Sequence, residues 1–232
     1  MQSAFSRTEV LLGSAGIEKL QHSSVTIIGL GGVGCYAAEA IARSGVGSIF
    51  IVDHDQVEIS NINRQLIALH STLGYYKTDV VANRLRDINP NLILKTYCGA
   101  YNHLSSEKIL GVKTDYVIDA IDSLSDKIHL IKSCFKKNIS IISSMGVARR
   151  LNPQALKIAD IKDTSICPLA RRVRRELNKE NIGTGVKTVF STEPPLPIAE
   201  GDMSELGSIV TVPATAGILL ASVVINDLLA KV

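Results

Sequence analysis

Aromatic side chains are scarce in this sequence of 232 residues: tryptophan is absent, and aromatic residues make up only 4% of the chain. Proteins that bind single-stranded nucleic acid by stacking its bases need aromatic side chains as platforms. The composition therefore argues against a stacking-based binding protein.

Cysteine is also scarce. The four cysteines, Cys35, Cys98, Cys134 and Cys167, form no CxxC pair. Structural zinc sites commonly show such paired ligands, and small disulfide-stabilised domains are much richer in cysteine. We therefore expect neither a zinc site nor a disulfide framework, but free thiols in a reducing, cytoplasmic compartment.

The sequence also lacks the marks of a secreted or membrane protein. Residues 1–7 contain no apolar run typical of a secretory signal. In the stretch 206–229 only Asp227 is charged, but Pro213 and Gly217 interrupt it. A membrane-spanning helix needs roughly 20 apolar residues. We expect a buried strand followed by a helix here, and no membrane span.

What the sequence does contain is an alternation of buried strands and helices. Hydrophobic residues make up 46% of the chain, enough for one α/β domain with a substantial core. The predicted strands cover 25–28, 49–52, 92–97, 116–121 and 139–142, and the predicted helices cover 32–44, 77–88 and 124–137. Such alternation is typical of parallel sheets with right-handed crossovers. The sequence thus predicts a Rossmann-like α/β fold, a mostly parallel sheet with helices on both faces.

The pattern changes after residue 148. We expect a strand at 156–161, an amphipathic helix at 168–179 and a proline-rich loop at 192–204. We therefore interpret the chain as a single domain. Its core covers 1–148, and a C-terminal basic appendage, with the last part of the sheet and the last helix, covers 149–232.

A glycine-rich loop joins the first predicted strand to the first predicted helix. Gly29, Gly31, Gly32 and Gly34 stand in its sequence GLGGVG. Glycines let backbone N–H groups approach phosphate oxygens, and a helix N-terminus favours negative charge. Asp53, at the end of the next strand, can accept hydrogen bonds from ribose hydroxyl groups. By itself this pattern is the dinucleotide fingerprint, for which NAD or FAD is the default ligand.

Polar residues beyond the second predicted strand favour a nucleoside triphosphate instead. The segment 53–65 reads DHDQVEISNINRQ, and a dehydrogenase has no need for its cluster of asparagine, arginine and glutamine. The guanidinium group of Arg64 can hold β- and γ-phosphate oxygens in a fork. Lys77, near a predicted helix start, adds a point charge that suits a phosphate.

Two carboxylates stand at the end of the predicted strand 116–121. These are Asp119 and Asp122, and the carboxyl ends of parallel strands meet at the ligand crevice. Mg²⁺ prefers one or two carboxylates together with phosphate oxygens. We therefore expect a carboxylate here to hold a magnesium ion that accompanies the triphosphate.

Together these motifs closely resemble the ThiF/MoeB/HesA superfamily, relatives of ubiquitin-activating enzymes that activate a carboxylate as an acyl-adenylate. The resemblance covers residues 1 to about 150 and rests on GLGGVG, DHDQVEISNINRQ, Lys77 and DAID. It implies a homodimer in which Arg7 reaches the triphosphate of the partner subunit. It also implies catalytic roles for Arg7, Arg64, Lys77 and Asp122, with Asp122 as the magnesium ligand. The residues implied to bind ATP are Gly29, Gly31, Gly32, Gly34, Asp53, Asp55, Ser60, Asn61, Asn63, Arg64, Gln65, Lys77, Asp122 and Ser123.

Shorter motifs favour one branch of the superfamily. Members that serve sulfur-carrier proteins usually carry two CxxC pairs for zinc, and Asp-Asn where this chain has Asp122-Ser123. The runs DAIDS, CPLARRVRREL and VFSTEPP instead resemble the tRNA threonylcarbamoyladenosine dehydratases, which cyclise a threonylcarbamoyl group on an adenosine beside the anticodon. This resemblance implies a cytoplasmic enzyme that uses ATP and Mg²⁺ on modified tRNA, and it suggests a partner from a cysteine-desulfurase system.

The charge distribution fits a tRNA partner. The formal net charge is only +3, yet residues 149–187 hold ten basic and four acidic residues. A basic face is the electrostatic footprint of a protein that contacts phosphate backbones. An ordinary solvated helix face is the alternative interpretation. The arginines that we expect to bind tRNA are Arg149, Arg150, Arg171, Arg172, Arg174 and Arg175.

Three other functions remain as alternatives. The chain could adenylylate the C-terminal glycine of a ubiquitin-like sulfur carrier, which would use the same ATP site. A non-catalytic nucleotide-sensing subunit is disfavoured because Arg64, Lys77 and Asp122 are all present. An NAD-dependent oxidoreductase is disfavoured by the polar segment that follows Asp53. The dehydratase scheme requires no cysteine, and we expect Cys167, the thiol best placed for a thioester, to be inert.

Overall fold

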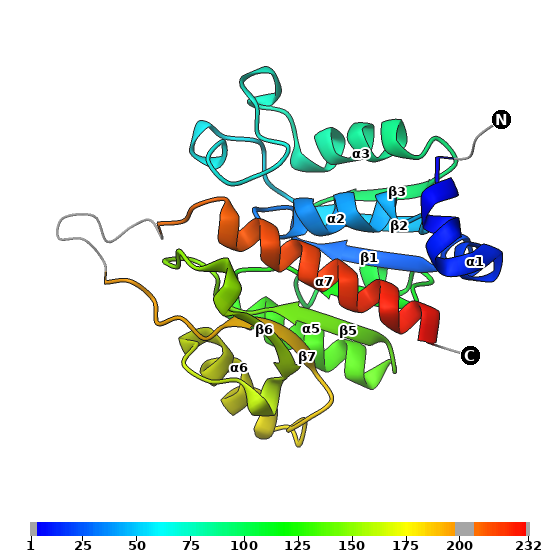
Figure 1. The fold of residues 1–232 in the computed structure, drawn as a ribbon. Coiled ribbons are helices and arrows are strands. Elements are labelled where there is room, and N and C mark those ends of the chain that lie inside the picture. Colours follow the sequence, from blue (N-terminus) through cyan, green and yellow to red (C-terminus); the bar gives the residue numbers. More distant parts are fainter. Residues whose placement is uncertain (1–3, 198–206, 231–232) are drawn as a thin grey trace.

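The computed structural model describes residues 4–197 and 207–230, and these form one seven-stranded sheet (Figure 1). The strand order is β3-β2-β1-β4-β5-β7-β6, and every pair is parallel except β7 with β6. This arrangement confirms the predicted mostly parallel α/β sheet. The strands are β1 (Ser24–Ile28), β2 (Ser48–Asp53), β3 (Ile93–Cys98), β4 (Tyr116–Asp119), β5 (Ser140–Ser144), β6 (Leu156–Asp160) and β7 (Lys187–Ser191).

Helices cover both faces of the sheet, as predicted. One buried cluster joins α2, α3 and α7 to one face, and a second joins α4, α5 and α6 to the other. Figure 1 shows α7 running alongside α2. The helices are α1 (Ser6–Gln21), α2 (Gly34–Arg43), α3 (Lys77–Ile88), α4 (Ser106–Leu110), α5 (Leu124–Lys136), α6 (Pro168–Asn178) and α7 (Thr211–Ala230).

The strands and helices of the first 148 residues form where periodicity placed them. β1 is buried along four of its five residues, as a central parallel strand must be. α3 has the predicted bounds because Lys77 begins the periodic pattern, while Pro90 disfavours helical backbone at Asn89.

α1, α4 and β7 were not predicted. α1 is kinked at Gly13, whose φ of 73° is not helical, so its sequence shows no continuous apolar stripe.

The prediction of a strand followed by a helix near the C-terminus is wrong for the described residues. Residues 207–210 form no strand, and 211–230 form the single helix α7. Pro213 lies in the first turn, where a missing N–H is tolerated. Gly217 lies where α7 meets α2, since a Cβ there would lie 2.4 Å from Val33 O. The predicted loop 192–204 has no helix or strand over 192–197, and its remainder lies outside the described residues.

α7 is the one helix, among those the structure describes, that is long and apolar enough to cross a membrane by length and composition. Its most apolar window has a mean hydropathy of 1.8, but 44% of that window is buried within the protein. Asp227 near its end accepts hydrogen bonds from Tyr116 and Lys187. These contacts are typical of a helix that packs against one face of the sheet.

Candidate active site

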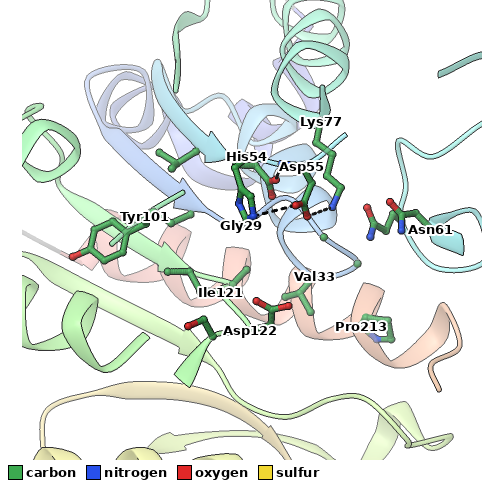
Figure 2. Close-up of a pocket in the computed structure, with 18 of the residues that line it drawn as sticks. Gly29, Val33, His54, Asp55, Asn61, Lys77, Tyr101, Ile121, Asp122 and Pro213 are labelled. Atoms are coloured by element: carbon green, nitrogen blue, oxygen red, sulfur yellow. Dashed lines mark hydrogen bonds and ion pairs between the residues drawn. The ribbon is translucent and has the colours of Figure 1, made fainter. Parts of the chain in front are cut away.

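A cavity of about 420 Å³ lies at the carboxyl ends of β1, β2 and β4 (Figure 2). Ligands of open parallel sheets bind at this edge. The cavity volume lies within the usual range for a small-molecule site, about 300–1,000 Å³. Of the predicted ATP-binding residues, the following line it: Gly29, Gly31, Gly32, Asp53, Asp55, Asn61, Arg64, Gln65, Lys77, Asp122 and Ser123.

The glycine loop forms the floor of the cavity because its backbone packs closely. Gly29 has φ of 91°, and a Cβ there would lie 2.6 Å from Ala120 O. Gly34 is buried and does not line the cavity. A Cβ at Gly34 would lie 1.8 Å from Gly29 O, so only glycine fits at this position. Gly34 therefore permits the tight turn into α2, while Gly31 faces open space. This is the geometry of a loop whose N–H groups can approach phosphates.

Asp53 holds the glycine loop to the end of β2. Its Oδ2 accepts a hydrogen bond from Leu30 N at 2.6 Å, and its Oδ1 accepts one from Asp55 N at 2.8 Å. The residue is only 8% exposed, yet it lines the cavity. A carboxylate oxygen can accept more than one hydrogen bond, so Asp53 still has capacity for a ribose hydroxyl group.

Lys77 begins α3 and points its ammonium group at the cavity wall. Its Nζ lies 2.7 Å from Asp55 Oδ2, although the Lys77 side chain is only 5% exposed. His54 Nε2 lies 3.2 Å from the other oxygen of Asp55. Figure 2 shows these three side chains on one side of the cavity and Asp122 on the opposite side. Gln65 adds a buried side-chain oxygen, Oε1, that has no hydrogen-bond partner.

The segment 56–76 brings the predicted phosphate ligands together. Its ends are tied by hydrogen bonds from Val57 N to Tyr75 O and from Lys77 N to Asp55 O. The guanidinium group of Arg64 lines the cavity and donates to Ser60 O at 2.7 Å. Two predicted ligands in this segment do not line the cavity: Ser60 and Asn63 are both exposed, and Asn63 donates to Ser208 O.

Asp122 and Asp126 provide the carboxylates that a magnesium ion requires. Both line the cavity, and within the described residues neither carboxylate makes a hydrogen bond or ion pair. Free carboxylate oxygens beside a phosphate loop fit a hard divalent cation. Asp119 does not fit this role, because it is 0% exposed and bound to Lys127. Sequence reasoning missed Asp126, which lies in the first turn of α5, just after the loop that carries Asp122.

Further walls of the cavity come from loops without a recognisable motif, and sequence reasoning missed them. Tyr101 lies at one end, where its hydroxyl group pairs with Ser106 Oγ and His129 Nδ1. Burial raises the pKa of Tyr101 and lowers the pKa of His129. Tyr101 is therefore uncharged at neutral pH. The other such residues are Gly99, Ala100, Val147, Ala148 and Ser208, and Pro213 in the first turn of α7 also lines the cavity.

Arg7 does not reach the cavity of its own chain. It is exposed on α1, two residues after Phe5, whose ring lies against Gly45 beyond the end of α2. The cavity lies at the start of α2, about 15 Å away along a ten-residue helix. Arg7 therefore does not line the cavity of its own chain.

The six arginines predicted to bind tRNA do not share one exposed face. Arg150 is only 4% exposed and donates to the carbonyl groups of Ala148 and Glu193, so its predicted surface position is wrong. Arg174 is partly buried and donates to Thr164 O at 2.9 Å. Arg149 is half-buried with φ of 58°. The exposed members are Arg171, Arg172 and Arg175 on α6, which buries Ala170, Val173 and Leu177 instead.

The cysteines show no common site within the described residues. Cys35, Cys134 and Cys167 are buried and Cys98 is exposed, and all four are free thiols. Burial raises the pKa of Cys35 far above its usual value and that of Cys134 to about 12. Cys167 precedes α6, and its Sγ lies 3.9 Å from Gly146 O.

Known proteins resemble this chain along almost its whole length. The sequence matches the ThiF family over residues 5–231. The tRNA threonylcarbamoyladenosine dehydratase of Bacillus subtilis is 43% identical over 243 residues, 99% of this chain and 96% of that protein. The crystal structure of the corresponding Escherichia coli dehydratase in complex with ATP superposes with a TM-score of 0.91 at 32% identity, covering 98% of this chain and 94% of that one.

A more distant class shares only part of the chain. The adenylyltransferase and sulfurtransferase of Culex quinquefasciatus is 32% identical over 151 residues, which cover 63% of this chain and 33% of that protein. The match over residues 5–231 and the near-complete alignment with the Bacillus subtilis relative are sufficient to assign the family. This chain belongs to the ThiF family.

Proposed function

We propose that this chain is an ATP-dependent dehydratase. It adenylylates the carboxylate of threonylcarbamoyladenosine in tRNA and cyclises it, releasing AMP and pyrophosphate. The main support for this proposal is the cavity, which Arg64, Lys77 and Asp122 line together with the glycine loop. The chain also aligns over almost its full length with the Bacillus subtilis dehydratase. Residues 1–148 supply most of the nucleotide site, and residues 149–232 supply the tRNA contacts.

In the first step, the threonyl carboxylate attacks the α-phosphorus of ATP and pyrophosphate leaves. Negative charge develops on the phosphates, and preorganised positive groups stabilise it. Lys77 and Arg64 supply that charge on one side of the cavity. The N–H groups of the glycine loop bind phosphate oxygens, and Asp53 accepts hydrogen bonds from the ribose.

Asp122 and Asp126 are the residues that would hold Mg²⁺. Both carboxylates line the cavity without a protein partner among the described residues, which is the support for this assignment. When bound, the ion neutralises charge on the phosphates and orients them.

In the second step, a nucleophilic atom of the same threonylcarbamoyl group attacks the activated carbonyl carbon. A ring closes, AMP leaves, and the net change is the loss of one water from the nucleoside. The protein contributes positioning and charge stabilisation, and no covalent enzyme intermediate is needed. The buried, high-pKa thiols of Cys35 and Cys134 fit a scheme without a cysteine nucleophile.

The active form is a homodimer. Arg7 is exposed at the far end of α2 from its own cavity, so a role for Arg7 at an ATP site requires the site of a second subunit. Modified tRNA lies along the exposed face of α6, where Arg171, Arg172 and Arg175 point outward. The enzyme works in the cytoplasm, where tRNA is found, and a cysteine-desulfurase-system protein is a candidate partner.

The alternative is adenylylation of the C-terminal glycine of a ubiquitin-like sulfur carrier. It would use the same ATP site, so only the substrate separates the two functions. The four cysteines include no CxxC pair, which disfavours the zinc-bearing members that serve sulfur carriers.

The proposal is tested by measuring AMP and pyrophosphate release from Mg·ATP with three additions: threonylcarbamoyl-modified tRNA, unmodified tRNA and a ubiquitin-like sulfur carrier. Release with modified tRNA alone supports the dehydratase. Release with the carrier protein alone would establish the alternative, and release with none of the three would contradict both.

A further inference from the structure

Two fully buried charges lie beneath the loop that carries Asp122. Lys127 on α5 and Asp119 at the end of β4 are both 0% exposed, and Lys127 Nζ lies 2.7 Å from Asp119 Oδ2. Removing two charges from water is unfavourable, so a buried ion pair is weak evidence for a stabilising role. Neither residue lines the cavity. The pair is therefore a candidate for fixing one local geometry.

Asp119 fixes the beginning of the Asp122 loop. Its Oδ1 accepts a hydrogen bond from Ile121 N at 3.0 Å. Its Oδ2 accepts hydrogen bonds from Lys127 Nζ and, at 2.6 Å, from Ser143 Oγ on the neighbouring strand β5. The carboxylate thus joins the residue before Asp122 to two elements of the core.

Lys127 lies in the first turn of α5, just after the same loop. Its backbone N–H donates to Ser123 O at 3.0 Å in the first turn of α5, and its Nζ lies 3.3 Å from Ser143 Oγ. One side chain therefore connects the start of α5 to the ends of β4 and β5. The loop 120–123 is held at both ends by groups that water does not reach.

The position of this loop matters because it also abuts the phosphate loop. Ala120 N donates to Ile28 O at 2.9 Å, and a Cβ on Gly29 would lie 2.6 Å from Ala120 O. Asp122 itself is exposed in the cavity without a hydrogen bond or ion pair to any described residue. The direction of its carboxylate must then come from its backbone. Figure 2 shows Asp122 directly after Ile121 on this loop.

We propose that Lys127 and Asp119 are positioning residues that set the backbone at 121–122, so that the Asp122 carboxylate meets the metal ion bound to ATP. This inference rests on the proposed function only for the binding of Mg·ATP and is independent of the tRNA substrate. The pair acts through Asp122 and touches neither nucleotide nor metal.

The test is the metal dependence of ATP binding. The double variant Asp119→Asn with Lys127→Met removes both buried charges and preserves most of the buried volume. Calorimetry gives the ratio of the Kd for ATP in EDTA to the Kd for ATP with Mg²⁺. We expect this ratio to fall by about 10- to 100-fold, the usual effect of losing a residue that orients a metal ligand. Lys132→Met, which breaks the exposed pair of Lys132 with Glu180 on the same helix, should leave the ratio unchanged.

Asp122→Asn provides the second half of the test. If the pair acts through Asp122, adding the double variant to Asp122→Asn should lower the ratio no further. An unchanged ratio in a folded double variant, or a further loss in the combined variant, would overturn the proposal. If the double variant does not fold, Ser143→Ala decides, since it removes one hydrogen bond to Asp119: a reduced ratio supports the proposal and a wild-type ratio rejects it. AMP release with modified tRNA tests the proposed function separately.

Discussion

The ammonium group of Lys77 lies 2.7 Å from Asp55 Oδ2, with the Lys77 side chain almost fully buried and that of Asp55 46% exposed. The pair holds a positive charge at the cavity wall before any nucleotide binds. A bound triphosphate can draw the ammonium group of Lys77 away from Asp55. The Asp55 carboxylate would then remain solvated, because its side chain is half exposed to water. Lys77 is therefore prepared for an anion, which is the first requirement of the proposed chemistry.

Loss of either phosphate-binding cation should abolish most of the activity. We expect Lys77→Met and Arg64→Ala each to lower the rate of AMP release by about 10²- to 10³-fold, as removal of one preorganised charge-stabilising group does. Folding should be affected little, because Asp55 and Arg64 are accessible to water. Lys137→Met, which breaks an exposed pair with Glu107, is the matched control. A rate close to wild type in either site variant would refute the assignment of that residue.

Gly29 and Gly31 should respond differently to the same added methyl group. Gly29→Ala forces a side chain into φ of 91° and against Ala120 O, so we expect a loss of about 1–3 kcal/mol in the free energy of unfolding. Gly31→Ala meets no atom within 4 Å, so stability should hardly change while ATP affinity falls, because the new group enters the cavity. Urea denaturation and calorimetry separate the two effects. Equal stability losses would contradict the close packing of the glycine loop.

The exposed arginines of α6 should determine how tRNA binding depends on salt. Arg171 and Arg172 make no ion pair or hydrogen bond through their side chains within the described residues. If both contact phosphates, changing them to alanine should reduce the slope of log K against log salt by about 2, roughly one for each lost contact. The control is the double variant Lys95→Ala with Lys113→Ala, which removes the same amount of positive charge from exposed positions outside α6. If the control lowers the slope as much, tRNA does not bind specifically at α6.

The four thiols should differ sharply in reactivity toward iodoacetamide. Cys98 is exposed and should be alkylated in the folded protein. Burial raises the pKa of Cys134 from 9.0 to about 12, so this thiol should remain protonated and unlabelled. A raised folded-state pKa also means that the contribution of Cys134 to stability is complete below pH 9 and is lost as pH rises toward 12. Peptide mass spectrometry that finds equal labelling of Cys98 and Cys134 would contradict the buried site.

Much of the fold and of the cavity could be predicted because the informative residues are local in sequence. The run Val25–Ile28 before GLGGVG reads as a buried strand and a phosphate loop, and the structure has both. Pro213 and Gly217 misled the prediction for the C-terminal stretch. They look like breaks in a helix, yet one lies in its first turn and the other permits close packing on α2.

Burial and long-range pairing could not be predicted from the sequence. Arg150 reads as a surface charge beside Arg149, but the chain folds so that its guanidinium group meets the carbonyl groups of Ala148 and Glu193. Asp119 reads as a metal ligand beside Asp122, but Lys127 neutralises it in the core. In both cases the partner that decides the role comes into contact only through the tertiary fold.

The most direct test of the proposed function follows the fate of the modified nucleoside. Purified enzyme is incubated with threonylcarbamoyl-modified tRNA and Mg·ATP, and the nucleosides are then released by digestion and analysed by mass spectrometry. The proposed dehydratase converts the modified adenosine to a product lighter by one water, only when ATP is present and not with Lys77→Met. An unaltered nucleoside after incubation with active, ATP-binding protein would contradict the account.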